Sequence, residues 1–200
     1  MNTINDLKSE SNINVFAKET VFEWKFVKIV VYKYTKGENP KEHFYEVVER
    51  TNAKKIISAL TVTQDEKIIL INQYRIPQGR FCIESPAGLR EDDNEPIEET
   101  TRREILEETW YEPEKLIYIG QTPSSSGLTT ELIDCYIWMN CKKVTNILAL
   151  DSAEDIQVIE VPLSEIDEFV NEINNRVDIT IDSKVLFMLW EYRKLIANIL

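Results

Sequence analysis

The stretch from Glu84 to Glu108 constrains this chain more than any other part of its sequence. It opens with a Pro-Ala-Gly turn, passes through a very acidic loop and ends in Arg103-Glu104-Ile105-Leu106-Glu107-Glu108. On an α-helix, Glu104, Glu107 and Glu108 fall within an arc of roughly 100°. Carboxylates on one face repel each other, whereas a divalent cation with oxygen ligands turns this repulsion into binding. By charge alone, such a face would instead be interpreted as solvent-exposed.

The overall charge limits which partners the chain can have. The 200 residues carry a net charge of −12, and sequence-independent binding to DNA, RNA or an anionic membrane needs a basic surface. The charge is compatible with a site that binds Mg²⁺ first and an anionic substrate through the metal. The three cysteines, Cys82, Cys135 and Cys141, form no CxxC pair, which favours reduced thiols and a cytoplasmic location. No apolar run approaches the length of a membrane span.

The order of apolar and polar segments predicts a mixed sheet with few helices. Residues rich in β-branched and aromatic side chains predict strands at 20–35, 43–50, 56–63, 67–73, 81–84, 115–121, 131–140 and 154–161. Helices are expected at 96–109, at about 164–174 and from Asp182 or Ser183 to the C-terminus. Residues 1–20 are expected to be loose and 86–95 to form a loop. This pattern indicates an α+β fold or a layered α/β/α sandwich.

The spacing of residues before and within the acidic helix is a more specific signal than its charge. Glu95 precedes Arg103 by seven intervening residues. Together with Gly88, the segment resembles the Nudix box, Gx5Ex7REUxEExGU, in which U is a bulky apolar residue. Two departures are present: six residues, and not five, separate Gly88 from Glu95, and Trp110 replaces the closing glycine. A one-residue loop insertion costs little, whereas that glycine usually ends the helix with a positive φ.

The resemblance extends over roughly residues 20–190 and points to one branch of the Nudix family, the ADP-ribose and ADP-sugar pyrophosphatases. It is carried by QYRIPQGRFCIESPAGL (73–89) and SSGLTTE (125–131), among other segments. The resemblance implies a Nudix α/β/α sandwich over 53–200 and a small antiparallel β unit over 1–52. It also implies a homodimer that hydrolyses the diphosphate bond of ADP-ribose or a related ADP-sugar to AMP and a sugar phosphate.

The resemblance also assigns the metal-binding and catalytic residues. It implies that the Ala87 carbonyl and the Glu104 and Glu108 carboxylates bind Mg²⁺, for which Mn²⁺ is a possible substitute. Glu107 is expected to be a further ligand or to support one, paired with Arg103 at i,i+4. Catalysis is therefore expected to depend on Glu107, Glu108 and a general base.

Two residues compete for the role of that base. Glu154 matches the family's proposed base, and such a group needs only to reach one water molecule. Glu131 is the other candidate, and an ordinary solvated carboxylate is the alternative for Glu154.

A second group of residues is expected to bind the phosphates and the sugar. Arg75 matches an arginine that contacts the phosphate or the terminal ribose, and a guanidinium suits phosphate because it offers a planar fork of donors. Glu84 is expected to face the diphosphate or a metal-bound water. Gly127 and Leu128 belong to the matching substrate loop.

A third group is expected to bind the adenine. Trp24 and Tyr45 match two aromatic residues that sandwich the base, one from each subunit. Glu46 is positioned to accept from the adenine amino group, and Arg50 to approach the base or the ribose. For any one aromatic residue on a strand, core packing is the ordinary alternative.

Two other functions remain open on the sequence. Ser126 stands where the ADP-ribose-specific relatives have proline, which leaves room for a Nudix pyrophosphatase acting on GDP-mannose, UDP-glucose or a dinucleotide. Trp110 leaves room for a nucleotide-sugar sensor that binds without hydrolysis, although a pure binding protein has no need of three carboxylates. The acidic charge disfavours RNA decapping.

Overall fold

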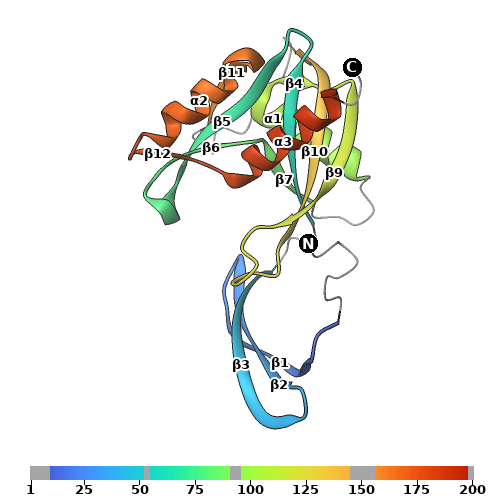
Figure 1. Ribbon diagram of the computed structural model, residues 1–200, viewed down its shortest axis with the longest axis vertical. Coiled ribbons are helices and arrows are strands. Elements are labelled where there is room, and N and C mark those ends of the chain that lie inside the picture. Colours follow the sequence, from blue (N-terminus) through green and yellow to red (C-terminus); the bar gives the residue numbers. More distant parts are fainter. Residues whose placement is uncertain (1–9, 52–54, 91–95, 145–155, 198–200) are drawn as a thin grey trace, which may run out of the picture. The chain divides into compact units, whose positions relative to one another are not determined.

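The computed structural model describes residues 10–51, 55–90, 96–144 and 156–197. The chain divides into two compact units (Figure 1). The first comprises Met1–Asn52 together with Pro123–Glu131, and the second comprises Ala53–Thr122 together with Leu132–Leu200.

The first unit is built on a three-stranded antiparallel sheet of β1 (Ile13–Glu23), β2 (Val27–Lys36) and β3 (Asn39–Arg50). The prediction of a loose segment was wrong for residues 13–20, which belong to β1, and the prediction of one strand over 20–35 was also wrong. The chain reverses at Trp24–Phe26, where the Trp24 N–H donates to the Val27 carbonyl at 2.8 Å. Neither Gly nor Pro marks this turn, and aromatic residues continue through it, so composition alone does not reveal it.

A buried carboxylate links the three strands of this sheet. Glu49 on β3 is 8% exposed and accepts hydrogen bonds from Lys18 on β1 at 3.1 Å and from the Tyr32 hydroxyl on β2 at 2.9 Å. Lys28 Nζ also lies 3.3 Å from it. The carboxylate is thus paired, as a buried charge must be to avoid a large desolvation cost.

The second unit contains a nine-stranded mixed sheet in which the order β12-β6-β5-β4-β10-β8 forms the main path. β11 pairs with β5, β7 with β4 and β9 with β10. The pairs β4–β10 and β6–β12 are parallel, which makes the sheet mixed. The strands are β4 (Lys55–Thr63), β5 (Lys67–Arg75), β6 (Arg80–Glu84), β7 (Ala87–Arg90), β8 (Tyr111–Glu112), β9 (Lys115–Pro123), β10 (Leu132–Lys143), β11 (Ile156–Pro162) and β12 (Ile179–Ile181).

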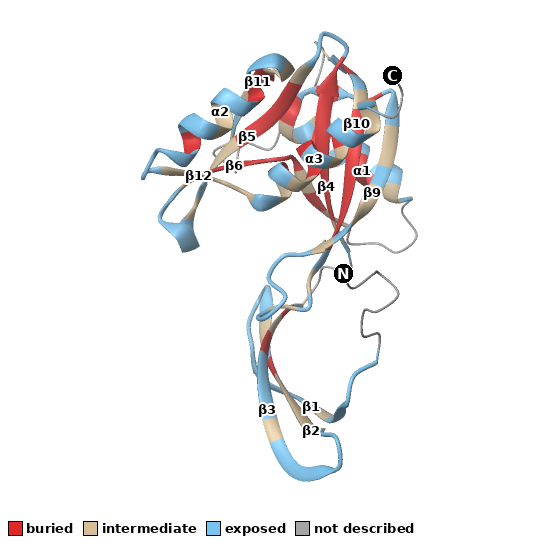
Figure 2. Ribbon diagram, viewed as in Figure 1, coloured by how far each residue is buried: buried red, intermediate tan, exposed pale blue. Residues whose placement is uncertain are grey.

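Helices pack on both faces of this sheet. Ile105 of α1 (Ile97–Thr109) belongs to a buried cluster with Ala59 and Trp138. The opposite cluster contains Leu60 together with residues of α2 (Ile166–Asn174) and α3 (Ser183–Ala197). Successive strand residues point to opposite faces, so Ala59 and Leu60 bury on different sides of β4, and Figure 2 shows the buried centre of these strands. The predicted α/β/α sandwich is confirmed.

Local predictions in this unit had mixed outcomes. The helix over 96–109 is confirmed as α1, and Asp182 caps α3 by accepting from the Lys184 N–H at 2.8 Å. The predicted loop was wrong for Ala87–Arg90, which form β7 and pair with β4. The Pro-Ala-Gly turn therefore leads directly into the sheet. Within the described ranges, no helix has the length and apolar character needed to cross a membrane.

Candidate metal and substrate site

The acidic face of α1 contacts the start of β7. The Ala87 N–H donates a hydrogen bond to Glu108 Oε2 at 3.1 Å. A Cβ added to Gly88 would lie 2.1 Å from Glu104 Cγ, so the Glu104 side chain occupies the space that any larger residue would need. Two of the three predicted carboxylates therefore converge on Ala87 and Gly88 at the start of β7.

Glu107 is placed differently from its two neighbours. Its side chain is 54% exposed and lies 3.7 Å from Arg103 Nη1, the pairing predicted from the i,i+4 spacing. The same Arg103 nitrogen donates to Glu104 Oε1 at 2.7 Å. Arg103 thus bridges Glu107 and Glu104 along the exposed side of the helix.

The oxygen atoms gathered at the start of β7 are suitable ligands for a hard divalent cation. Ala87, Glu104 and Glu108 offer only oxygen atoms as ligands, and Mg²⁺ is commonly held by one or two carboxylates, water molecules and substrate phosphates. In the described part of the chain, no group of three or more His, Cys, Asp or Glu side chains is arranged to hold a metal ion. Ala87, Glu104 and Glu108 supply fewer ligands than the six of an octahedral Mg²⁺ ion, so a cation held by them would keep coordination positions for substrate and water.

Trp110 ends α1 in the left-handed conformation that a glycine normally supplies. Its φ is 63° and its ψ is 23°, and its N–H donates to the Leu106 carbonyl at 3.0 Å. The helix end is therefore formed without distortion despite the missing glycine. A residue with a Cβ pays roughly 1–2 kcal/mol for this conformation, so neighbouring contacts must hold it in place.

This backbone strain predicts the relative stability of two variants. Trp110→Gly and Trp110→Ala both remove the half-buried indole, but only glycine adopts the left-handed conformation without cost. We expect Trp110→Gly to be more stable than Trp110→Ala by about 1 kcal/mol, or roughly 3 °C in melting temperature for a chain of this size. Thermal unfolding followed by circular dichroism measures the difference, and equal melting temperatures would contradict the assigned backbone conformation.

A polar network that no sequence pattern indicated anchors Tyr111, the residue that follows this helix end. Tyr111 is 5% exposed, and its hydroxyl donates to Glu160 Oε1 on β11 at 2.8 Å. Lys143 and Lys67 also donate to the Glu160 carboxylate, at 2.9 Å and 3.2 Å. Hydrogen bonds from Lys143 and then Tyr111 lower the pKa of Glu160 to about 2.

The lowered pKa of Glu160 predicts how stability depends on pH. A carboxyl group whose pKa falls on folding stabilises the native state above its unfolded pKa and loses that contribution as pH falls toward the folded value. With a third of the side chain exposed, we expect a contribution of about 1–2 kcal/mol, fully present above about pH 4.5 and lost toward pH 2. In urea unfolding, the stability difference between the parent and Glu160→Gln should shrink over that range; a constant difference would contradict this.

The two residues expected near the diphosphate pair with each other. Arg75 on β5 donates from Nε and Nη2 to the two oxygens of Glu84 on β6, at 2.5 Å and 2.7 Å. The Glu84 side chain is 9% exposed, whereas that of Arg75 is 40% exposed. This bidentate pair fixes the orientation of the buried carboxylate.

The first unit brings together most residues expected to contact the nucleoside. Tyr45 on β3 donates its hydroxyl hydrogen to the Gly127 carbonyl at 2.9 Å, and the Val48 N–H donates to the Leu128 carbonyl at 2.8 Å. Arg50 forms an ion pair with Glu131. The 123–131 loop is therefore fixed on β3, next to the exposed Glu46.

Trp24 lies beyond the Arg50 end of β3, whereas Tyr45 is near the middle of that strand. It is 71% exposed in the β1–β2 turn, close to Val27, which is opposite Arg50 in the sheet. Five residues of strand separate Arg50 from Tyr45, or about 17 Å. The two aromatic residues of one chain therefore do not stack on the same base.

Of the two candidates for the general base, Glu131 lies within the described residues and Glu154 does not. Both oxygens of Glu131 are engaged, by Arg50 and by the Ser124 hydroxyl at 2.9 Å. Glu154 lies outside the described residues, as does Glu95 of the sequence motif.

Comparison with known proteins bears on the family of the chain. The family model of the NUDIX domain matches residues 54–178. A Bacillus methanolicus protein named methanol dehydrogenase activator is 30% identical, over 77% of this chain and 80% of its own length. ADP-ribose pyrophosphatase of Bacillus subtilis is 33% identical, over 74% and 78%. Mouse ADP-sugar pyrophosphatase is 28% identical, over 86% and 83%.

The fold also has a counterpart among solved structures. A crystal structure of an ADP compounds hydrolase superposes with a TM-score of 0.76 at 16% identity and covers 96% of this chain and 98% of its own. Such low identity bears on the fold alone. The NUDIX match spans more than half of the chain, and two relatives of at least 30% identity are covered over more than two thirds of their length. The chain therefore belongs to the Nudix hydrolase family.

Proposed function

We propose that the protein hydrolyses the diphosphate bond of ADP-ribose or a related ADP-sugar, with Mg²⁺, to give AMP and a sugar phosphate. The main observation in support of this proposal is that Glu104 and Glu108 converge on Ala87 and Gly88 at the start of β7. Nudix hydrolases generally use divalent metal ions. The substrate class is supported by the names of the Bacillus subtilis and mouse relatives.

In this mechanism the carboxylates of α1 hold metal and do not attack the substrate. Glu104, Glu108 and the Ala87 carbonyl would be the ligands, with Glu107 aligned by Arg103. A cation bound there would supply charge neutralisation of the diphosphate and a lower pKa for a bound water. Positioning and electrostatic stabilisation provide most of the rate acceleration in such displacements.

The remaining steps are assigned to residues outside the helix. Arg75 orients a phosphate or the terminal ribose, and its bidentate pair with Glu84 holds that carboxylate near the diphosphate. Glu154 takes the proton from the attacking water. The engagement of both Glu131 oxygens supports Glu154 over Glu131 for this role.

The nucleoside end of the site requires a second copy of the chain. Trp24 and Tyr45 are too far apart along one sheet to stack on one adenine, so we assign one ring to each subunit of a homodimer. Glu46, Arg50, Gly127 and Leu128 would line the same part of the site. The apolar side chains exposed on this sheet support a partner of the same kind: Val15, Phe16, Val21, Phe22, Phe26 and Phe44.

The dimer predicts a coupling between assembly and substrate affinity. We expect light scattering to give twice the chain mass of 23.4 kDa. Trp24→Ala is expected to raise KM for ADP-ribose by about tenfold, because base stacking contributes roughly 1–3 kcal/mol. Trp190→Ala on α3, also exposed, is the matched control and should leave KM unchanged. A monomer that hydrolyses ADP-ribose would contradict the shared site.

A hydrolysis assay with Mg²⁺ tests the proposed function against its alternatives. The substrates are ADP-ribose, ADP-glucose, GDP-mannose, UDP-glucose and diadenosine polyphosphates, with AMP and the sugar phosphate quantified by chromatography. Preference for GDP-mannose, UDP-glucose or a dinucleotide would indicate a Nudix pyrophosphatase of another substrate specificity. Ser126 is the residue that suggests this alternative. Binding without turnover of any substrate would indicate a sensor.

The cellular setting is part of the same proposal. Cys82, Cys135 and Cys141 are buried and unbridged, which fits the reducing cytoplasm. The net charge of −12 supports a small-molecule substrate over a nucleic acid.

A further inference from the structure

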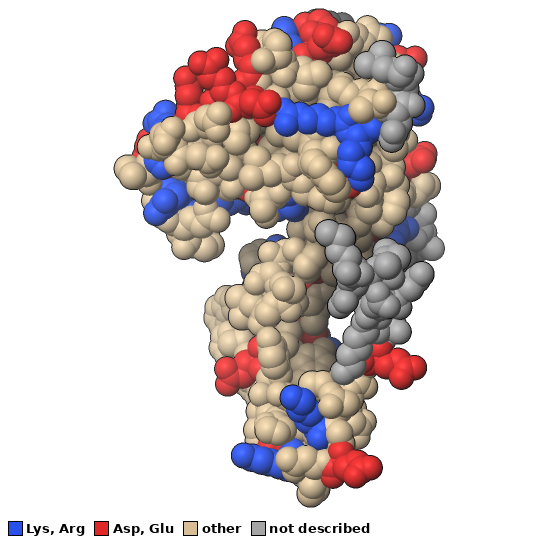
Figure 3. All heavy atoms as spheres, viewed as in Figure 1, with Lys and Arg blue, Asp and Glu red and all other residues tan. Residues whose placement is uncertain are grey.

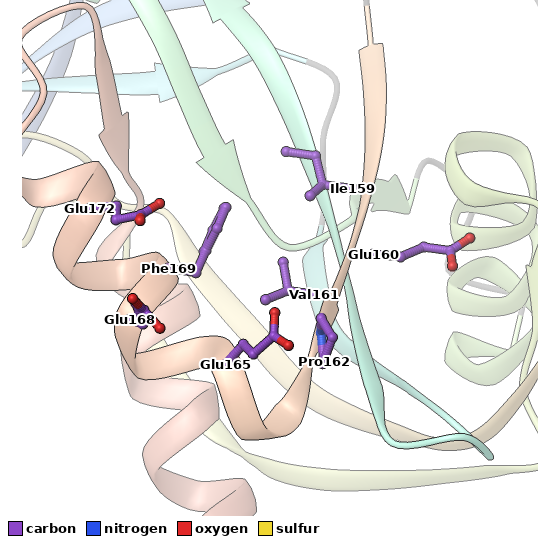
Figure 4. Close-up of a pocket in the computed structure, with 8 residues that line it drawn as sticks. All are labelled: Ile159, Glu160, Val161, Pro162, Glu165, Glu168, Phe169 and Glu172. Atoms are coloured by element: carbon purple, nitrogen blue, oxygen red, sulfur yellow. The ribbon is translucent and has the colours of Figure 1, made fainter.

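The Glu160 carboxylate accepts hydrogen bonds from three different residues, Tyr111, Lys143 and Lys67. Acidic side chains gather over the α2 side of this unit in Figure 3. Glu160 lines a pocket of about 240 Å³ together with Glu168 and Glu172 of α2 and Glu165, which directly precedes α2. Figure 4 shows that its carboxylate nevertheless points away from these three and toward α1.

We propose that Glu160 is a positioning residue for the metal-binding helix, acting through Tyr111 on the carboxylates of Glu104 and Glu108. The inference rests on the metal role of α1 in the proposed function. Glu160 lies on β11, outside the sequence motif, and would still influence the affinity for the metal.

The connection from Glu160 to the helix runs through short, partly buried steps. Tyr111 follows the last helical turn directly, and its hydroxyl bond to Glu160 fixes the ring in the buried cluster that contains Ile105 of α1. Lys143 lies opposite Tyr111 in the β8–β10 pair, and its ammonium group is 5.6 Å from the centre of the Tyr111 ring. Glu160 therefore holds both the tyrosine and the strand beside it.

The helix end needs such an anchor because Trp110 is in the left-handed conformation. With glycine at that position the turn would form without strain, whereas a tryptophan there must be restrained from both sides. On one side the Trp110 N–H is bound to Leu106, and on the other the Val144 N–H donates to the Trp110 carbonyl at 2.8 Å. The Tyr111–Glu160 bond comes one residue later and fixes the direction in which the chain leaves.

Glu108 is only two residues from Trp110, so a change at the helix end reaches the metal ligands first. If the last turn frays, Glu108 loses its bond to the Ala87 N–H, and Glu104 one turn earlier loses its packing on Gly88. Groups that orient metal ligands typically contribute 10- to 100-fold in metal affinity. The expected effect is thus on metal binding more than on global stability.

The test measures Mn²⁺ binding to the full chain by electron paramagnetic resonance, without substrate. Tyr111→Phe removes only the hydroxyl group, and Glu160→Ala removes its acceptor. Each is expected to weaken Mn²⁺ binding by about tenfold, and the double variant by no more than either single one, because both break the same connection. Tyr192→Phe, at a tyrosine buried in the opposite cluster, is the matched control and should bind like the parent.

Each result decides for or against the inference. Tenfold weaker binding in both variants, with a non-additive double variant and an unchanged control, supports it. A decrease below threefold, an equal decrease in Tyr192→Phe, additive effects or a parent that binds no Mn²⁺ would overturn it. Hydrolysis of ADP-ribose is assayed separately, so a parent that binds Mn²⁺ without turnover contradicts the proposed function alone.

Discussion

Replacement of Glu108 by glutamine is expected to lower turnover of ADP-ribose by at least about 10³-fold while the fold stays intact. Glutamine keeps the side-chain volume and an acceptor oxygen for the Ala87 N–H. It removes the negative charge on which binding of a hard divalent cation depends. The loss should therefore appear in kcat and in metal affinity, with the free energy of unfolding changed by less than about 1 kcal/mol.

The control for this variant lies on the same helix. Glu99→Gln changes the same chemical group at an exposed position of the first turn, on the other side of α1 from Glu108. It should retain full activity and the parent's melting temperature. Undiminished hydrolysis by Glu108→Gln at saturating Mg²⁺ would refute the metal role of this carboxylate.

The sequence predicted the bounds of α1 well because the relevant information is local. The Arg103–Glu107 spacing and the apolar Ile105 define one helical face each, and a period of 3.6 residues fixes which side chains lie together. The β7 strand was missed because Ala87–Arg90 is short and contains no β-branched residue. Its extended conformation comes from pairing with β4, a contact that no local pattern encodes.

The parts of the site that depend on distant segments were accessible only through resemblance or not at all. The contact of Tyr45 with Gly127 joins two segments whose local sequences carry no sign of each other. The Tyr111–Glu160 bond is a clearer case, because a tyrosine after a helix and a glutamate on a strand are both ordinary in isolation. Only the fold places them 2.8 Å apart.

Trp110 shows how a departure from a sequence motif is accommodated in structure. The motif glycine supplies a backbone conformation, and the chain adopts that conformation with tryptophan in its place. What glycine achieves by lacking a Cβ is here achieved by contacts on either side of the residue. Trp110 therefore indicates a restrained helix end. It gives no reason to prefer a sensor that binds without hydrolysis over an enzyme.

Replacement of Gly88 by alanine is expected to reduce kcat by about 10²-fold without unfolding the protein, because catalytic groups displaced by about 1 Å typically cost that much. The added Cβ would lie 2.1, 2.4 and 2.7 Å from Glu104 Cγ, Cδ and Cβ, so the whole Glu104 side chain must move. In a Glu104→Gln background the same substitution should change kcat little further, since its target is already impaired. Gly127→Ala, whose nearest neighbour is an ordinary 3.7 Å away, controls for stability. Parent-like activity of Gly88→Ala would show that Glu104 need not occupy this position for catalysis.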